Sequence, residues 1–152
     1  MNDNQFIYAG IGSRETPEAI CNKMTKIGFL LYQKGYFLYS GGADGADKAF
    51  ALSVPETGKK IWRPSDVTDE AIELAKKFHP NWATLKPWGQ NLIARNGFQI
   101  LGPTLKTPVK FIVCWTKDGK ASGGTGQALR IAQAYNIPVY NLFNSNFSTE
   151  EI

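Results

Sequence analysis

Three short glycine-bearing segments are the part of this sequence best suited to chemistry. They are GIGSRE (10–15), SGGADGAD (40–47) and SGGTGQ (122–127). Glycine lets backbone N–H groups turn toward a ligand and lets the ligand approach closely, and the N-terminus of a following helix adds partial positive charge. Together the three segments predict a pocket for a phosphate group.

Several side chains in and beside these segments suit the same chemistry. The Arg14 guanidinium can fork onto a phosphate or pair with a nearby glutamate, and Ser13 and Ser40 can bind phosphate or cap helices. Thr125, with the backbone of Gly123 and Gly124, is the expected anion cradle. The predicted ligand-binding residues are Gly12, Ser13, Arg14, Ser40, Gly41, Gly42, Asp44, Trp115, Thr116, Gly123, Gly124, Thr125 and Gln127.

Two aspartates complicate the second segment, because a phosphate loop should not carry negative charge. Asp44 stands where a helix N-cap belongs, and Asp47 can return a hydrogen bond and face the helix dipole. Alternatively, Asp44 accepts hydrogen bonds from ribose hydroxyls or a base amine. For Asp47 we expect the capping role.

Several other chemistries lack their motifs. The first segment has Glu15 where the dinucleotide fingerprint needs its third glycine, and the chain contains neither GxxxxGK[ST] nor GxSxG. Cys21 and Cys114 are far apart and His79 is the sole histidine, so a zinc site is not expected. We therefore predict no catalytic residue, metal or cofactor, and expect both cysteines to be reduced core residues.

The apolar pattern predicts strands that alternate with helices. Thr16 is the expected N-cap of the first helix, Pro17 opens it and Gly35 ends it. Pro80 and Pro87 are each expected to interrupt regular secondary structure. Strands are expected at 6–12, 36–40, 59–64, 109–116 and 137–142, and further helices at 43–53, 68–79, 91–101 and 125–136.

This alternation predicts an α/β fold, a three-layer Rossmann-like doubly wound parallel sheet of about five strands. Residues 1–152 are expected to form a single domain with a core over 6–142. In such sheets the ligand lies outside the carboxyl ends of the strands, where the strand order reverses. Trp115 and Thr116 end the most apolar strand and are expected at that point.

The segments YAGIGSRETP, SGGADGAD and CWTKDGKASGGTGQALRIA, followed by IPVYNL, resemble the SLOG superfamily. Its members include the Rossmann-like core of DprA (Smf) proteins and, more distantly, the LOG "lysine decarboxylase-like" phosphoribohydrolases. The resemblance spans residues 7–142, and its nearest form is the small stand-alone DprA-like protein of bacteria and their phages.

The resemblance implies a pocket for a nucleotide or nucleotide-derived ligand. The residues that match the three loops of this family are Gly12, Ser13, Arg14, Gly41, Gly42, Gly123, Gly124 and Thr125. LOG-type hydrolases carry PGGxGTxxE, whose glutamate supports cleavage of an N-glycosidic bond. Here Gln127 follows the glycines, and an amide cannot exchange a proton as an acid–base group does. DprA proteins bind single-stranded DNA with help from surfaces outside the Rossmann core.

The leading hypothesis is therefore a sensing or sequestering module that captures a nucleotide-derived small molecule by its phosphate, without being an enzyme. One alternative is a nucleoside monophosphate N-glycosidase in which Asp44 or Glu15 replaces the glutamate. Another is DprA-like binding of single-stranded DNA, which the net charge of +4 permits.

We expect a cytoplasmic homo-oligomer without a signal peptide or membrane contact. In ARNG, Arg95 and Asn96 either reach the pocket from a helix or pair on the surface. Tryptophans 62, 82 and 88 are expected to pack in the core or at an oligomer contact.

Overall fold

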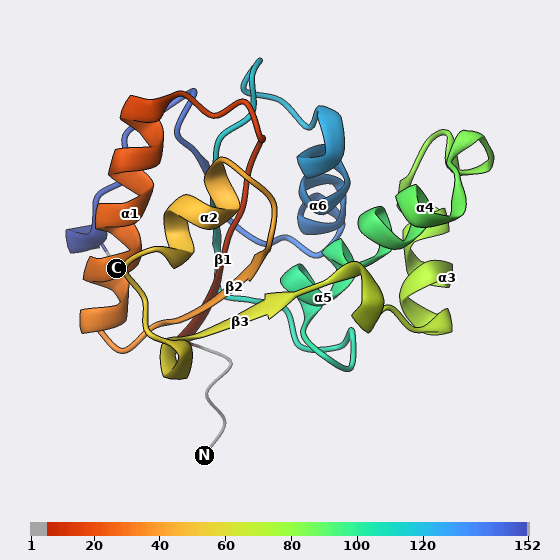
Figure 1. The fold of residues 1–152 in the computed structure, drawn as a ribbon, viewed down its shortest axis with the longest axis horizontal. Helices are drawn as coiled ribbons and strands as arrows, with labels where there is room; N and C mark the ends of the chain where they lie inside the picture. Colours follow the sequence, from red (N-terminus) through yellow and green to blue (C-terminus); the bar gives the residue numbers. More distant parts are fainter. Residues whose placement is uncertain (1–5, 152) are drawn as a thin grey trace.

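The computed structural model describes residues 6–151 and contains one five-stranded sheet (Figure 1). All strand pairs are parallel, in the order β3-β2-β1-β4-β5. The strands are β1 (Ile7–Gly10), β2 (Phe37–Gly41), β3 (Lys59–Trp62), β4 (Ile112–Cys114) and β5 (Val139–Asn141). The helices are α1 (Glu18–Gln33), α2 (Ala46–Ala51), α3 (Asp69–Phe78), α4 (Pro87–Ala94), α5 (Asn96–Leu101) and α6 (Gly123–Ala134). Short 3-10 helices are η2 (Glu56–Gly58), η3 (Pro64–Asp66), η4 (Trp82–Thr84) and η5 (Thr149–Glu151).

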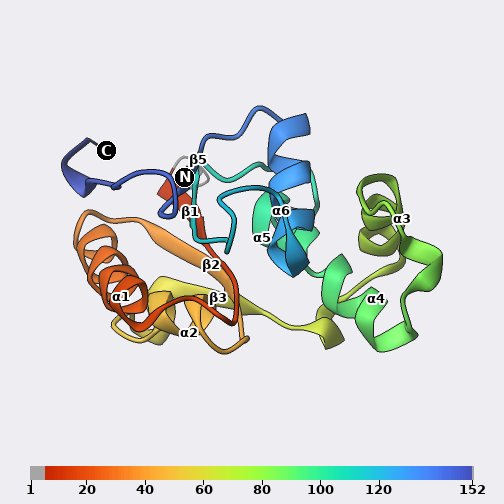
Figure 2. The same ribbon diagram turned by 90° about the horizontal axis from the view of Figure 1, so that it is seen from above.

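The strands send alternate side chains into two separate hydrophobic clusters, as a sheet buried on both faces requires. On β1, Tyr8 packs into the cluster under α1 and α2, while Ile7 and Ala9 pack into the cluster under α3, α5 and α6. On β4, Val113 joins the first cluster and Ile112 joins the second. Figure 2 shows α1 and α2 on one side of the sheet and α5 and α6 on the other. The predicted doubly wound α/β fold is confirmed.

The first helix follows its apolar pattern but begins later than predicted. Met24, Ile27 and Leu31 are buried against the sheet, spaced as one helical face. Pro17 holds the N-cap position, and the Thr16 hydroxyl donates to the Ser13 carbonyl instead of capping the helix. The prediction of Thr16 as N-cap is therefore wrong, because Thr16 closes the preceding turn.

The middle of the chain is more helical than the prolines predicted. Pro87 begins α4 rather than breaking structure, since its missing N–H is harmless in a first helical turn. The expected helix over 91–101 is divided at Arg95 into α4 and α5. Thr68 caps α3 by accepting the Ala71 N–H at 3.3 Å. In Figures 1 and 2, α3 and α4 extend beyond α5 and α6, away from α1 and α2.

The strand order reverses beside β1, whose two neighbours are β2 and β4. The chain passes from β1 through β2 to β3 on one side and then returns to place β4 on the other. The loops after β1 and β4 therefore diverge at this point and leave room outside the carboxyl ends of the strands.

Cys114 is fully buried, as expected, whereas Cys21 is half-buried. Within residues 6–151, no helix has both the length and the apolar character needed to cross a lipid bilayer.

Candidate functional site

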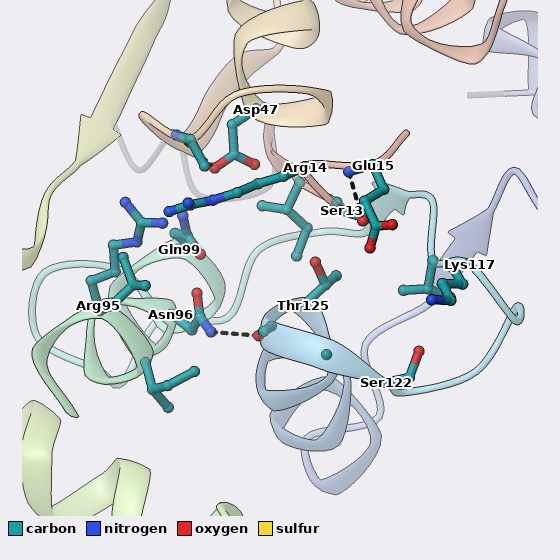
Figure 3. A pocket seen from close by; sticks show the side chains of 18 of the residues that line it. Ser13, Arg14, Glu15, Asp47, Arg95, Asn96, Gln99, Lys117, Ser122 and Thr125 are labelled. Atoms are coloured by element: carbon teal, nitrogen blue, oxygen red, sulfur yellow. Dashed lines mark hydrogen bonds between the residues drawn. The ribbon is translucent and has the colours of Figure 1, made fainter. Parts of the chain in front are cut away.

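A cavity of about 610 Å³ lies at this reversal point. It is bounded by the loops after β1 and β4, by the N-terminus of α6, and by one face of α4 and α5. Figure 3 shows Arg14 and Arg95 pointing toward one another across it, with Asp47 on one side and Thr125 on the other. Its lining includes Gly12, Ser13, Arg14, Glu15, Asp47, Trp88, Leu92, Arg95, Asn96, Gln99, Thr116, Gly123, Gly124 and Thr125.

Backbone hydrogen bonds fix the position of the loop after β1. The Ser13 N–H donates to the Trp115 carbonyl at 3.1 Å, and the Ala46 N–H donates to the Ser13 carbonyl at 3.3 Å. A Cβ on Gly12 would lie 2.6 Å from the Ala46 Cβ, so a glycine is needed for this close packing. The loop thereby carries Arg14, whose side chain is exposed, to the cavity mouth.

The N-terminus of α6 has backbone N–H groups that can donate to a ligand. The first N–H groups of a helix have no partner within the helix. The Ser122 hydroxyl, which stands at the N-cap, donates to Asp118 at 2.7 Å and makes no capping hydrogen bond. A Cβ on Gly123 or Gly124 would meet no atom of residues 6–151 within 4 Å. Asn96 holds this end of the helix in place by donating to the Gly124 carbonyl at 3.1 Å.

Arg95 supplies a buried positive charge. The residue is 8% exposed, and its Nε has no hydrogen-bond partner within the described part of the chain. Its Nη1 donates to the Trp62 carbonyl at 3.4 Å. Burial lowers the pKa of Arg95, nearby Asp47 raises it, and Arg14 and Arg63 lower it further. Guanidinium groups that approach one another in this way favour a bound anion.

Asp47 faces the cavity from α2. It is 4% exposed and accepts the Ala43 N–H at 3.3 Å rather than the Asp44 N–H, so the predicted capping role of Asp47 is wrong. Burial raises the pKa of this carboxyl to about 6, while Arg95, the N–H groups of Ala43 and Gly12, and Arg14 act in the opposite direction. A carboxyl with such a pKa exchanges protons near neutral pH.

Asp44 does not cap α2. Gly45 precedes the helix with φ of +82°, which turns the chain so that the helix begins at Ala46 and Asp44 points outward. The Asp44 carboxylate forms an ion pair of 2.7 Å with Lys48, and its side chain is 77% exposed. The prediction of Asp44 as N-cap is therefore wrong, and this residue does not line the cavity.

The structure brings some of the predicted ligand-binding residues together at the cavity and leaves others elsewhere. Those that line it are Gly12, Ser13, Arg14, Thr116, Gly123, Gly124 and Thr125. Ser40 is fully buried and donates to the Gly10 carbonyl at 2.5 Å. Trp115 packs against Phe143 rather than facing the cavity, its ring centroid 6.2 Å from that of Phe143.

Gly41 and Gly42 line a separate, shallower hollow beside Lys59, Lys60 and Arg63. Gly41 nevertheless shapes the cavity from behind. A Cβ there would lie 2.6 Å from Asp47 Oδ2, 2.7 Å from Gln99 Nε2 and 2.9 Å from Arg95 Cζ. The second glycine segment thus makes space for side chains of the site rather than for a ligand.

Gln127 holds two helices together. It is fully buried, donates to the Ala75 carbonyl of α3 at 3.1 Å, and accepts from Arg130 at 3.1 Å. Arg130 also donates to the Phe78 carbonyl at 2.7 Å. Gln127 therefore ties α6 to α3 and does not reach the cavity.

Sequence reasoning left Arg95 and Asn96 open between cavity and surface, assigned Trp88 to packing or an oligomer contact, and overlooked Gln99. The structure places all four on the cavity. The signal that would have found them is their spacing, since residues 88, 92, 95, 96 and 99 repeat as one face of a helix.

Comparisons with known proteins give one structural likeness. No family model matches the chain, and no curated protein matches it. A solved structure of DNA processing protein A from Helicobacter pylori, described for its unique mode of binding single-stranded DNA, superposes with a TM-score of 0.64 at 18% identity. The match covers 91% of this chain and 66% of that chain, so this protein spans just under two thirds of its neighbour's length. The chain therefore shares the DprA-like fold.

Proposed function

We propose that this protein binds a nucleotide or nucleotide-derived small molecule by capturing its phosphate group, and acts as a sensing or sequestering module. The observation that carries the proposal is the meeting of Arg14, Arg95 and the uncapped N-terminus of α6 on one cavity. Backbone N–H groups and guanidinium groups are the usual ligands of a protein-bound phosphate. We also propose that the chain is a small DprA-like member of the SLOG superfamily, which the likeness of fold supports.

Native mass spectrometry of the purified protein tests this function first. We expect a bound nucleotide, and the same spectra give the oligomeric state, which we expect to be a homo-oligomer. A thermal-shift series with nucleoside monophosphates should then raise the melting temperature, because a ligand at one hundred times its Kd adds about 2.7 kcal/mol to the unfolding free energy. Indifference to every nucleotide would overturn the proposal.

A matched pair of arginines shows whether the cavity is the site. Arg14 and Arg63 are both exposed and both follow a strand, but only Arg14 lines the cavity. We expect Arg14→Gln to weaken nucleotide binding about 10- to 100-fold, since a hydrogen bond to a charged group contributes roughly 1.5–3 kcal/mol. Arg63→Gln should have a much smaller effect. Equal losses in the two variants would place the ligand elsewhere.

A second candidate is hydrolysis of a nucleotide N-glycosidic bond, which the position of Asp47 favours. Its carboxyl is buried in the cavity with a pKa near 6, as a general base requires. Asp47 would take a proton from water as the water oxygen bonds to C1′ and the bond from C1′ to the base breaks. The departing base then takes up this proton from Asp47, which restores the carboxylate. Release of free base by the protein, abolished in Asp47→Asn, supports this candidate, and intact nucleotides after long incubation exclude it.

A third candidate is binding of single-stranded DNA, which the fold likeness favours. It predicts a shift of a labelled oligonucleotide that weakens steeply with salt, because phosphate contacts release counterions. Absence of a shift at low salt would exclude it.

A further inference from the structure

One face of α4 and α5 crosses the cavity from its mouth to its floor. Trp88, Leu92, Arg95, Asn96 and Gln99 all line it, at the spacing of successive helical turns. Arg95 itself has helical backbone angles, and the N–H groups of Phe98 and Gln99 both donate to its carbonyl. The helical path therefore continues through the division between the two helices.

This face changes its chemistry along its length. The inner end is buried and polar: Arg95 and Asn96 are each 8% exposed and Gln99 is 1% exposed. Gln99 Oε1, like Arg95 Nε, has no hydrogen-bond partner in the part of the chain that the structure describes. The outer end carries Trp88, which is 68% exposed.

Trp88 differs from the other tryptophans in its surroundings. Trp62 stacks on Phe98 at 4.9 Å between ring centroids, and Trp82 and Trp115 lie edge-on or tilted against His79 and Phe143. The prediction that the three central tryptophans serve packing is confirmed for Trp62, which is buried in the core, and for Trp82, which packs against the core. Trp88 instead presents its ring to solvent at the cavity mouth.

The distance between the two ends suits a nucleotide. Arg95 lies seven positions after Trp88, which corresponds to a rise of about 10 Å along a helix at 1.5 Å per residue. A nucleoside monophosphate has its phosphate at one end and its planar base at the other. Tryptophan is well suited to receive such a base, because an aromatic ring stacks on any π-face.

Resting on the proposed function, we infer that Trp88 is the base platform of this site, and that the ligand binds with its phosphate inward and its base outward. The site therefore takes nucleoside monophosphates as a class and prefers them to sugar phosphates, which lack the planar base. Because stacking tolerates every base, Trp88 sets this class and not the identity of the base.

Isothermal titration calorimetry with a nucleoside monophosphate, ribose 5-phosphate and inorganic phosphate tests the inference. In the unmodified protein we expect the nucleotide to bind about 5- to 150-fold more tightly than ribose 5-phosphate, the range that stacking on an aromatic ring supplies. Trp88→Ala should abolish this preference and leave ribose 5-phosphate binding unchanged. Trp88→Phe should keep most of it, because the ring remains.

Trp82→Phe is the matched control, since Trp82 belongs to the same region but does not line the cavity; it should keep the full preference. Circular dichroism checks that each variant is folded. Equal binding of nucleotide and ribose 5-phosphate, with no effect of Trp88→Ala, would overturn the inference while the proposed function stands. Failure of all three compounds to bind the unmodified protein would overturn both.

Discussion

The two walls of the cavity use glycine for opposite reasons. The packed wall consists of Gly12, Gly41 and Asp47, and the open wall consists of Gly123, Gly124 and Thr125. A Cβ on Gly12 or Gly41 would come within 2.6 Å of another atom, whereas one on Gly123 or Gly124 would meet nothing within 4 Å. Glycine in the packed wall lets protein atoms meet. In the open wall, Gly123 has a φ of +64° that favours glycine, whereas Gly124 leaves room for something outside the protein.

This difference separates two meanings of the same sequence signal. The segments SGGADGAD and SGGTGQ both place two glycines after a serine and near a helix N-terminus. In the first segment, the absence of a Cβ on Gly41 leaves space for the side chains of Asp47, Gln99 and Arg95. In the second, the glycines are exposed and the helix end has no side-chain cap. We therefore expect changes in the packed wall to alter stability and changes in the open wall to alter binding.

The largest expected effect comes from the buried carboxyl of the packed wall. Burial raises the pKa of Asp47 from its ordinary 3.8 to about 6. A raised pKa in the folded state gives stability that is complete below pH 3.8 and lost as pH rises through 6, about 3 kcal/mol in all. Asp47→Asn removes this dependence. Urea unfolding at pH 4 to 7 should show the stability of the variant rising by about 2.5 kcal/mol relative to that of the unmodified protein, since a small part of the change lies below pH 4.

Asp44→Asn is the control for this measurement, because Asp44 is exposed and paired with Lys48 at the surface. Its stability relative to the unmodified protein should show no such rise between pH 4 and 7. A flat difference for Asp47→Asn as well would mean that water reaches the carboxylate and that the packed wall is not closed.

The second-largest expected effect is a loss of stability when Gly12 is replaced by alanine. Gly12→Ala places a methyl group 2.6 Å from the Ala46 Cβ and 3.0 Å from the Trp115 carbonyl oxygen. Overpacking of this kind costs roughly 1–3 kcal/mol, so the urea midpoint should fall while the slope is kept. Gly42→Ala is the matched control, since its nearest atom is the mobile end of Arg63 at 3.2 Å. A loss in Gly42→Ala as large as that in Gly12→Ala would contradict the distinction.

Much of the fold follows from local pattern. The apolar run over 109–116 predicts a strand buried on both faces, and the rule that ligands lie at the carboxyl ends of strands brought Arg14, Thr116 and Thr125 toward one place. Both predictions needed only the apolar pattern, the glycine-bearing segments and the alternation of strands with helices. Residues near the ends of β1 and β4 were therefore accessible to sequence reasoning.

The rest of the site depends on geometry that local pattern does not contain. The positive φ of Gly45 turns Asp44 outward and Asp47 inward, which reverses the roles that their spacing predicted. Gln127 looks like a ligand residue beside its glycines, but the packing of α3 on α6 buries it. Such outcomes depend on contacts between residues that are distant in sequence.

The smallest expected change in stability belongs to the open wall and is the sharpest test of the comparison. Gly124 lies in the first turn of α6 without a neighbouring atom in the space of a Cβ. Gly124→Ala should leave the unfolding free energy unchanged or raise it by up to about 1 kcal/mol, because alanine is the better helix former. The added methyl group should nevertheless weaken phosphate binding, since it stands where a ligand would approach the backbone N–H groups. Thermal unfolding with and without a nucleoside monophosphate separates the two effects. A variant that is at least as stable alone, yet gains less stability from the ligand, shows that Gly124 is needed for ligand access. If Gly124→Ala binds the nucleotide as tightly as the unmodified protein does, the open wall is not the phosphate site.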